Sequence, residues 1–208
     1  MKENMKCGNI EMRVWLETIQ NVIGQNGLNA VLNHGNLKKY VDNFPPADYE
    51  MLIAAEEICS LFSSLHKIFG QKGSHSLLLR IGRERARIGI EKYNKGMMKA
   101  LMLAARLVPE TIKMRLSLEK LIEEQNRVIP DSMELHEEEE FFLLIYRESF
   151  ESEKIMSEAP VCGATLGSLQ YGMEWITGHP HKVEEVECKA MGHPADVFRI
   201  WKTTVADE

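Results

Sequence analysis

The sequence predicts an α+β fold, in which an N-terminal helical bundle packs on a small antiparallel sheet with one inserted helix. The first observation is a change of periodicity. Apolar residues recur mainly at helical spacings from Glu11 to about Arg127, and the pattern of strands prevails from about Ser132 to Lys202. The second is size, because 208 residues with 44% hydrophobic content can bury a core without disulfides. We therefore expect a single domain of residues 1–208, with a helical part at 9–130 and a sheet part at 131–203.

Glycines and prolines bound the predicted helices. The first helix stops near Gly24, and a long helix that follows the Phe44-Pro45-Pro46 segment ends at Gly70. Pro109 lies at the start of the last helix of this part. The expected helices cover residues 12–23, 28–33, 47–69, 74–93 and 109–129.

The sheet part is expected to contain two hairpins with a helix between them. The acidic run Glu137 to Glu140 forms the tip of the first hairpin. Gly178 closes the helix, which begins at about Cys162 and ends at about Ile176. The expected strands cover residues 132–136, 141–146, 183–191 and 196–201.

Charge and cysteine content restrict the class of protein. A net charge of −6 argues against a nucleic-acid partner, since such binding depends on clustered Lys and Arg. No apolar tract of about 18 residues predicts a membrane span, and the polar N-terminus lacks the apolar core of a signal peptide. Four widely spread cysteines suit a reducing compartment. These observations predict a cytoplasmic protein.

Two cysteines and two carboxylates near the C-terminus form a candidate metal site. Cys162 begins a helix, and Cys188 and Asp196 face each other across the turn of the second hairpin. Glu185 lies on the opposite face of a regular strand from Cys188, so it joins them only through a β-bulge; otherwise Glu184 is on the correct face. Thiolates and carboxylates suit a zinc ion, and four protein ligands make that zinc structural. A Cys162 to Cys188 disulfide is the competing interpretation.

Small and flexible residues in the helical part are candidates for a ligand pocket. Gly82, Ala86 and Gly89 share one face of their helix, which lets either another helix or a flat ligand come close. Methionine side chains adapt either to a pocket or to gaps in a core. The predicted pocket residues are Gly82, Ala86, Gly89, Met97, Met98, Met102 and, on the inserted helix, Gly167.

Several segments resemble a known family. Ala159 to Cys162, the glycines that follow, and Glu185 to Gly192 are similar to the 4-vinyl-reductase domain. Earlier stretches, Met12 to Glu17, Asp42 to Pro46 and Leu79 to Arg83, are similar to the helical half of single-domain "predicted hydrocarbon-binding" members. The resemblance spans roughly residues 9–202.

The resemblance implies the ligand-binding fold of NO-signalling and Golgi-transport proteins, shared with gas-sensing haem domains and vesicle-tethering subunits. In related phenol-responsive regulators, one glutamate and three cysteines hold a structural zinc beside an aromatic-ligand pocket. Cys162, Glu185 and Cys188 match three of those positions, and Asp196 stands where the fourth cysteine is expected. His193, on the nearby turn, is an alternative fourth ligand.

Three functions follow as expectations. The first is a non-catalytic domain that binds or senses a small hydrophobic or aromatic molecule, with structural zinc as its cofactor and a homodimer as its assembly. The second is an enzyme or accessory factor in the reduction of tetrapyrrole vinyl groups, although no catalytic motif or hydride source is recognisable. The third is an oligomeric interaction scaffold. The sequence does not identify the ligand.

Overall fold

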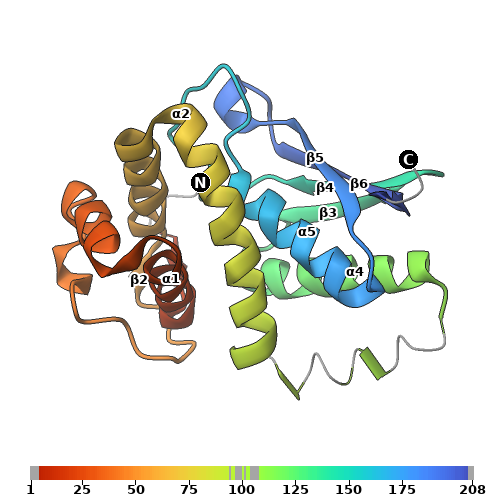
Figure 1. The fold of residues 1–208 in the computed structure, drawn as a ribbon, viewed down its shortest axis with the longest axis horizontal. Coiled ribbons are helices and arrows are strands. Elements are labelled where there is room, and N and C mark those ends of the chain that lie inside the picture. The colour runs from red at the N-terminus through yellow and green to blue at the C-terminus, as the bar shows by residue number, and fades with distance from the viewer. Residues whose placement is uncertain (1–4, 94, 97–99, 101, 104–107, 206–208) are drawn as a thin grey trace.

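The computed structural model describes residues 5–93, 95–96, 100, 102–103 and 108–205 (Figure 1). A group of N-terminal helices lies on one side, and a sheet with two helices lies on the other. The second half of helix α2 runs between them. This arrangement confirms the predicted α+β class, with helices first in the chain and the sheet afterwards.

Two long helices form the N-terminal half. Helix α1 covers Asn9–His34, and helix α2 covers Ala55–Ile88. Each is kinked at a glycine with positive φ, 75° at Gly24 and 67° at Gly70. The predicted helix ends at these glycines are therefore turning points, because the helix resumes immediately after each one.

A short sheet, not predicted, fixes the start of α2. Strand β1 (Lys6–Cys7) pairs with β2 (Ile53–Ala54), and the 3-10 helix η1 (Lys38–Tyr40) lies between them in the chain. The sequence predicted that this helix begins at Ala47. It begins at Ala55 instead, because Ile53 and Ala54 pair with strand β1 near the N-terminus. The pairing also buries Cys7.

The C-terminal half is a four-stranded antiparallel sheet covered by two helices. The strand order is β3-β4-β6-β5, and helices α4 and α5 pack on one face. Two short elements complete the chain order. The π-helix η2 (Gly89–Tyr93) follows α2, and the 3-10 helix η3 (Lys189–Met191) lies between β5 and β6. The bounds are α4 Glu110–Val128, β3 Met133–Glu137, β4 Phe141–Tyr146, α5 Gly163–Thr177, β5 His181–Glu187 and β6 Asp196–Thr204.

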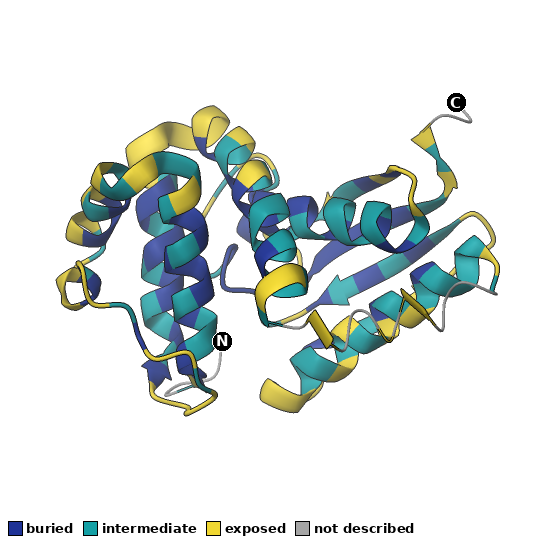
Figure 2. Cartoon of the chain, turned by 60° about the horizontal axis from the view of Figure 1, so that its bottom comes forward, coloured by how far each residue is buried: buried dark blue, intermediate teal, exposed yellow. Residues whose placement is uncertain are grey.

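Two separate apolar cores result. The first core lies inside the helical half, where it includes Met12 and Phe62. The second core lies between α4, α5 and the inner face of the sheet, where it includes Met114 and Met173 (Figure 2). In β4 every second residue is buried, so Phe142, Leu144 and Tyr146 face this second core.

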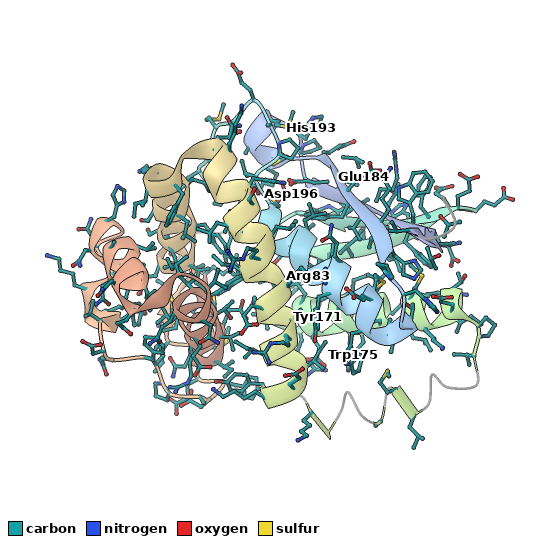
Figure 3. All side chains as sticks on the ribbon, viewed as in Figure 1. Arg83, Tyr171, Trp175, Glu184, His193 and Asp196 are labelled. Atoms are coloured by element: carbon teal, nitrogen blue, oxygen red, sulfur yellow. The ribbon has the colours of Figure 1, made fainter. Side chains whose placement is uncertain are left out.

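Helices α2 and α5 join the two halves by close backbone contact. A Cβ atom at Gly82 would collide with the carbonyl group of Ala164, and one at Gly167 would collide with the carbonyl group of Leu79. Beside this crossing, Arg83 of α2, which is labelled in Figure 3, forms an ion pair of 2.6 Å with Glu174 of α5. Gly82 and Gly167 therefore allow the two helices to pack closely. The sequence had left open whether such small residues pack against a helix or line a pocket.

Candidate functional site

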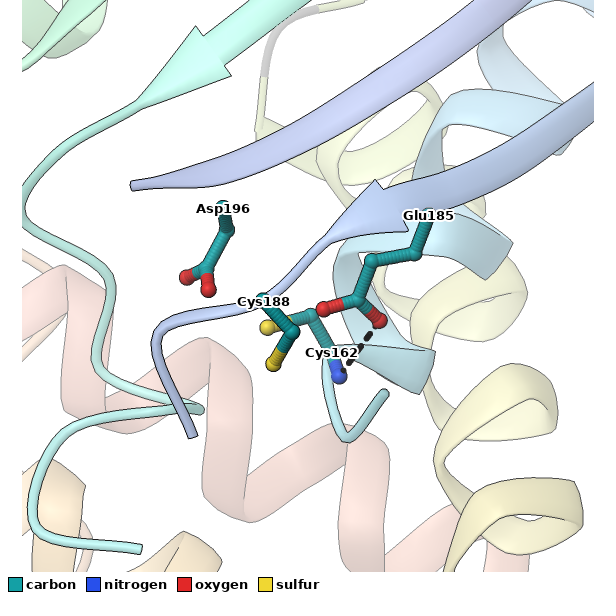
Figure 4. A group of neighbouring side chains, drawn as sticks. All are labelled: Cys162, Glu185, Cys188 and Asp196. Carbon is teal, nitrogen blue, oxygen red and sulfur yellow. Dashed lines mark hydrogen bonds between the residues drawn. The ribbon is translucent and has the colours of Figure 1, made fainter. Parts of the chain in front are cut away.

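The four predicted metal ligands converge at the N-terminal end of α5 (Figure 4). Cys162 is the N-cap of α5, Cys188 follows β5, and Asp196 begins β6. Together with a carboxylate oxygen of Glu185, the two thiols and the Asp196 carboxylate place their ligand atoms within 4.8 Å of one another. The convergence follows from antiparallel pairing, which returns β6 beside the end of β5.

Glu185 reaches this cluster because β5 is irregular. Glu185 pairs with Phe198 and Glu187 pairs with Val197, with a register shift between them. The sequence analysis predicted that Glu185 could join Cys188 on one face of the strand only through a β-bulge. This register shift is that bulge. The Glu185 carboxylate accepts a hydrogen bond of 2.9 Å from the backbone N–H of Cys162.

The two alternative ligands lie elsewhere. Glu184 accepts a hydrogen bond of 3.0 Å from the Trp201 indole on the other side of the sheet. His193 is exposed on the turn, with Nδ1 3.7 Å from Glu187. Both are apart from the Asp196 carboxylate in Figure 3. Neither belongs to the group of converging side chains.

Asp196 is fully buried but hydrogen-bonded. One carboxylate oxygen accepts from the Ser152 hydroxyl at 2.6 Å, and the other accepts from the backbone N–H of Lys189 at 2.7 Å. The Glu185 Oε1 atom, in contrast, is buried and has no hydrogen-bond partner among the described residues. A buried carboxylate oxygen without a partner is costly, so this atom suits a proton or a cation.

Proton positions show how the cluster limits its buried charge. A hydrogen bond from the Cys162 thiol lowers the pKa of Cys188 to about 6. Burial raises the pKa of Glu185 to about 9 and holds the pKa of Cys162 well above its usual range. These directions favour the thiolate form of Cys188 and the protonated forms of Cys162 and Glu185. A bound cation would replace these two protons.

Glu151 is a further buried carboxyl group that the sequence analysis missed. It accepts hydrogen bonds from the backbone N–H groups of Ala164 and Thr165, both at 2.7 Å, and from the Thr165 hydroxyl at 2.5 Å. Glu151 thereby caps the N-terminus of α5 beside Cys162. Sequence rules for caps inspect the N-cap residue itself, so a cap from a distant loop leaves no local signal.

Replacing Glu151 by glutamine is expected to change how stability depends on pH. Burial raises the pKa of Glu151 to about 8, so the folded protein holds a proton there that the unfolded chain releases at lower pH. The difference in unfolding free energy, wild type minus Glu151→Gln, should therefore fall by up to about 1.4 kcal/mol per pH unit as pH rises from 5 to 8. Urea unfolding of chelator-treated protein measures this difference, and a constant difference would contradict the assignment.

The predicted pocket residues are not gathered around one hollow. Ala86 and Gly89 are half-buried near the end of α2, Met102 is 37% exposed, and Met97 and Met98 lie outside the described residues. Two hollows of about 360 and 440 Å³ lie beside α1, and the first has charged groups of α2 and η2 on its other side. None of the five predicted pocket residues that the structure describes lines either hollow. Their role at a pocket stays a prediction.

Comparisons with known proteins identify the fold but no family. No protein-family model matches the chain, and no curated protein matches it. Among solved structures, the Fe(II) unliganded H-NOX protein from K. algicida matches at TM-score 0.59 and 15% identity, covering 94% of this chain and 96% of that one. A structure from a study of heme distortion in the H-NOX family matches at TM-score 0.59 and 13% identity, covering 95% and 96%.

A different kind of protein has the same fold. The phenol-responsive sensory domain of the transcription activator PoxR, solved with phenol, matches at TM-score 0.51 and 16% identity, covering 74% of this chain and 77% of that one. At these identities the likeness establishes the fold alone. That fold is the H-NOX fold. It confirms the predicted ligand-binding fold of NO-signalling and Golgi-transport proteins. Among the described helices, none has the length and apolar character needed to cross a membrane.

The prediction of zinc as the cofactor is contradicted. Two H-NOX structures match 95% and 97% of the chain, and a structure from a study of heme redox potential matches 92% of it, so these neighbours point to haem and not to zinc. Neither the contact between α2 and α5 nor the two hollows described above offers a place for haem. Helices α2 and α5 meet backbone to backbone at Gly82 and Gly167, and no histidine lines either hollow. We assign no step to either group.

Proposed function

We propose that this protein is a non-catalytic domain that binds a small hydrophobic or aromatic molecule and signals its presence. The observation that carries the proposal is the fold, which a phenol-responsive sensory domain shares over 74% of this chain. In such a domain, ligand binding changes the packing of elements that a partner can contact. The resemblance of the sequence to predicted hydrocarbon-binding proteins supports the same class of ligand.

The second core is the proposed place for the ligand. It is bounded by two helices and one face of the sheet, and Met114, Met133 and Met173 are buried in it. Methionine side chains are flexible, so a core rich in them can rearrange around an apolar guest. Tyr146 lies in the same core and offers a phenolic hydroxyl for orientation.

The cluster at the start of α5 supports the floor of this core. Cys162 and Cys188 belong to both the cluster and the second core, so cluster and core are in direct contact. We propose that the four side chains hold a metal ion whose identity is not assigned. Such an ion would neutralise the buried charge and fasten α5 to the sheet through Cys162, Glu185, Cys188 and Asp196.

Thermal denaturation with phenols and monocyclic aromatic hydrocarbons tests the ligand class. A ligand at a hundredfold excess over its Kd should raise Tm by about 5–10 °C. Native mass spectrometry of the same samples should show one ligand per chain. Absence of any shift across the panel would contradict the proposal, and a shift with porphyrins alone would favour the role in vinyl-group reduction.

A matched pair of variants locates the site. Met114→Phe adds a ring to the second core and is expected to reduce the ligand-induced Tm shift by at least about half, because added volume competes with the guest. Met12→Phe makes the same change in the first core, where Met12 is equally buried, and should leave the shift unaltered. Equal shifts in both variants would place the ligand outside the second core.

Assembly and location remain predictions. We propose a cytoplasmic homodimer, because the expected output of a sensory domain is a change at an interface with a partner. Light scattering coupled to size-exclusion chromatography distinguishes a 23.8 kDa monomer from a dimer of twice that mass. A larger assembly that no aromatic compound stabilises would favour the interaction scaffold.

A further inference from the structure

The kink of α2 at Gly70 projects from the molecule as an elbow, by which we mean residues 67–73. Every residue of the elbow is exposed, and a Cβ atom at Gly70 would meet nothing within 4 Å. Ser74, which is fully buried, holds the elbow in shape, because its hydroxyl donates a hydrogen bond of 3.0 Å to the backbone carbonyl of Gln71. The elbow is therefore a defined convex feature of the surface.

Two large apolar side chains occupy the tip of the elbow. Ile68 and Phe69 come directly before Gly70, and each is 39% exposed. They continue the buried stripe of Leu61 and Leu65 by one helical turn, but the first core ends before it reaches them. Because water solvates such side chains poorly, contact with an apolar environment would be favoured at this tip.

A second segment brings another apolar side chain to this end of the molecule. The Gln71 side chain donates a hydrogen bond of 2.6 Å to the Ser157 hydroxyl, in the loop between β4 and α5. Met156, next to Ser157 in that loop, is 88% exposed. Figure 1 shows this loop and the kink of α2 at the same end of the molecule. The exposed apolar side chains here are therefore Ile68, Phe69 and Met156.

The charges around these side chains are mostly positive. Lys67 and Lys72 flank the tip, and Lys154 is exposed in the neighbouring loop. None of these three lysines forms an ion pair with a residue that the structure describes. Residues 58–83 contain no Asp or Glu, although the chain has a net charge of −6, and Glu158 is the exposed acidic residue of the loop. The elbow is therefore a basic region on an acidic protein.

We infer that the elbow is a docking site for an anionic lipid surface. Ile68 and Phe69 enter the headgroup layer, with Met156 beside them, and Lys67 and Lys72 pair with the lipid phosphates. The cytoplasmic leaflet of a membrane is rich in anionic lipids, so this apolar and basic tip is complementary to it in charge and in hydrophobicity.

The shape and size of the elbow favour lipid over a protein partner. A stable interface between proteins covers about 800 Å² of each partner with matched shape, and one convex turn of chain offers only a small part of that area. A lipid surface needs no matched shape, because its headgroups move aside for each side chain that enters. Docking would bring the domain to the place where apolar molecules collect, but it does not depend on the proposed ligand.

Co-sedimentation with vesicles tests the docking on the full-length chain. Vesicles of phosphatidylcholine with about 30% phosphatidylserine should bind wild type about tenfold more tightly than vesicles of phosphatidylcholine alone, because the lysines need anionic headgroups. High salt should remove most of this difference by screening the charges. No binding, or equal binding to both kinds of vesicle, would overturn the inference and leave an acidic protein as the alternative occupant.

Two variants and their matched controls assign the binding to the elbow. Phe69→Ser, and Lys67→Gln combined with Lys72→Gln, should each lower the affinity for anionic vesicles about tenfold. Leu52→Ser and Lys38→Gln change exposed residues elsewhere and should bind as wild type. All four proteins should keep the wild-type Tm, because exposed positions contribute little to stability. Wild-type affinity in either elbow variant would overturn the inference.

Fluorescence quenching tests whether the tip enters the lipid. Phe69→Trp adds an indole at the elbow, and Leu52→Trp adds one at an exposed control position. Anionic vesicles that contain brominated lipid should quench the added fluorescence of Phe69→Trp by about half, because the bromine atoms act only on groups inside the bilayer. The added fluorescence of Leu52→Trp should stay unquenched. Equal quenching of the two variants would contradict insertion of the elbow.

Discussion

Gly82→Ala and Gly167→Ala are each expected to destabilise the protein by about 3 kcal/mol, because a methyl group would separate two helices that touch through their backbones. At Gly82 the new Cβ would lie 2.7 Å from the Ala164 carbonyl carbon, and at Gly167 it would lie 3.1 Å from the Arg83 nitrogen, besides the collisions with the carbonyl oxygens. Backbone atoms cannot swing aside as the end of a side chain can. Urea unfolding at fixed pH measures the loss.

Gly172→Ala is the matched control for Gly167→Ala. It makes the same change in α5, where a Cβ would meet nothing within 4 Å. Alanine is a better helix former, so this variant should gain about 0.4–1 kcal/mol. If Gly167→Ala proves as stable as Gly172→Ala, the close contact between α2 and α5 is not present in solution.

Cys188→Ser is expected to weaken cation binding at the cluster at least about 100-fold, because it removes a thiolate ligand. Cobalt(II) is a suitable probe, since thiolate ligation gives an intense charge-transfer band. Wild type should show this band, with an affinity that rises from pH 6 to 9 as the cation displaces protons from Cys162 and Glu185.

Two further variants make the cobalt experiment specific. Cys7→Ser removes a buried thiol that lies outside the cluster and should leave the band unchanged. Asp196→Cys adds a thiolate at the position where the sequence resemblance led us to expect a cysteine, and should intensify the band. A wild-type titration without a charge-transfer band, or an unchanged band in Cys188→Ser, would contradict the metal site.

Most of the fold could be predicted because its signals are local. Gly24, Gly70 and Gly178 were predicted as helix ends, and each has positive φ, although the helix resumes after Gly24 and Gly70. Pro109 was recognisable as the start of a helix, which begins at Glu110. The pairing of β1 with β2 was not predictable, because two-residue strands separated by more than forty positions have no periodicity of their own.

The cluster was only partly predictable. Spacing placed Cys162, Cys188 and Asp196 together, because the start of a helix and the two sides of a hairpin turn are local features. Spacing alone left Glu184 and Glu185 as alternatives, and only the register shift in β5 put Glu185 on the inner face. The identity of a bound ion does not follow from spacing, and the prediction of zinc was wrong.

The sequence by itself determined the order and type of the main elements, since periodicity, proline and glycine act on the chain within one or two turns. Tertiary structure alone decided which distant groups are neighbours: Glu151 at the start of α5, and Arg83 of α2 beside Glu174 of α5. The physical reason is that a buried polar group is stabilised by whatever surrounds it in space. The side of the sheet on which a residue lies and the helix that covers it depend on packing of the whole chain, which no short segment encodes.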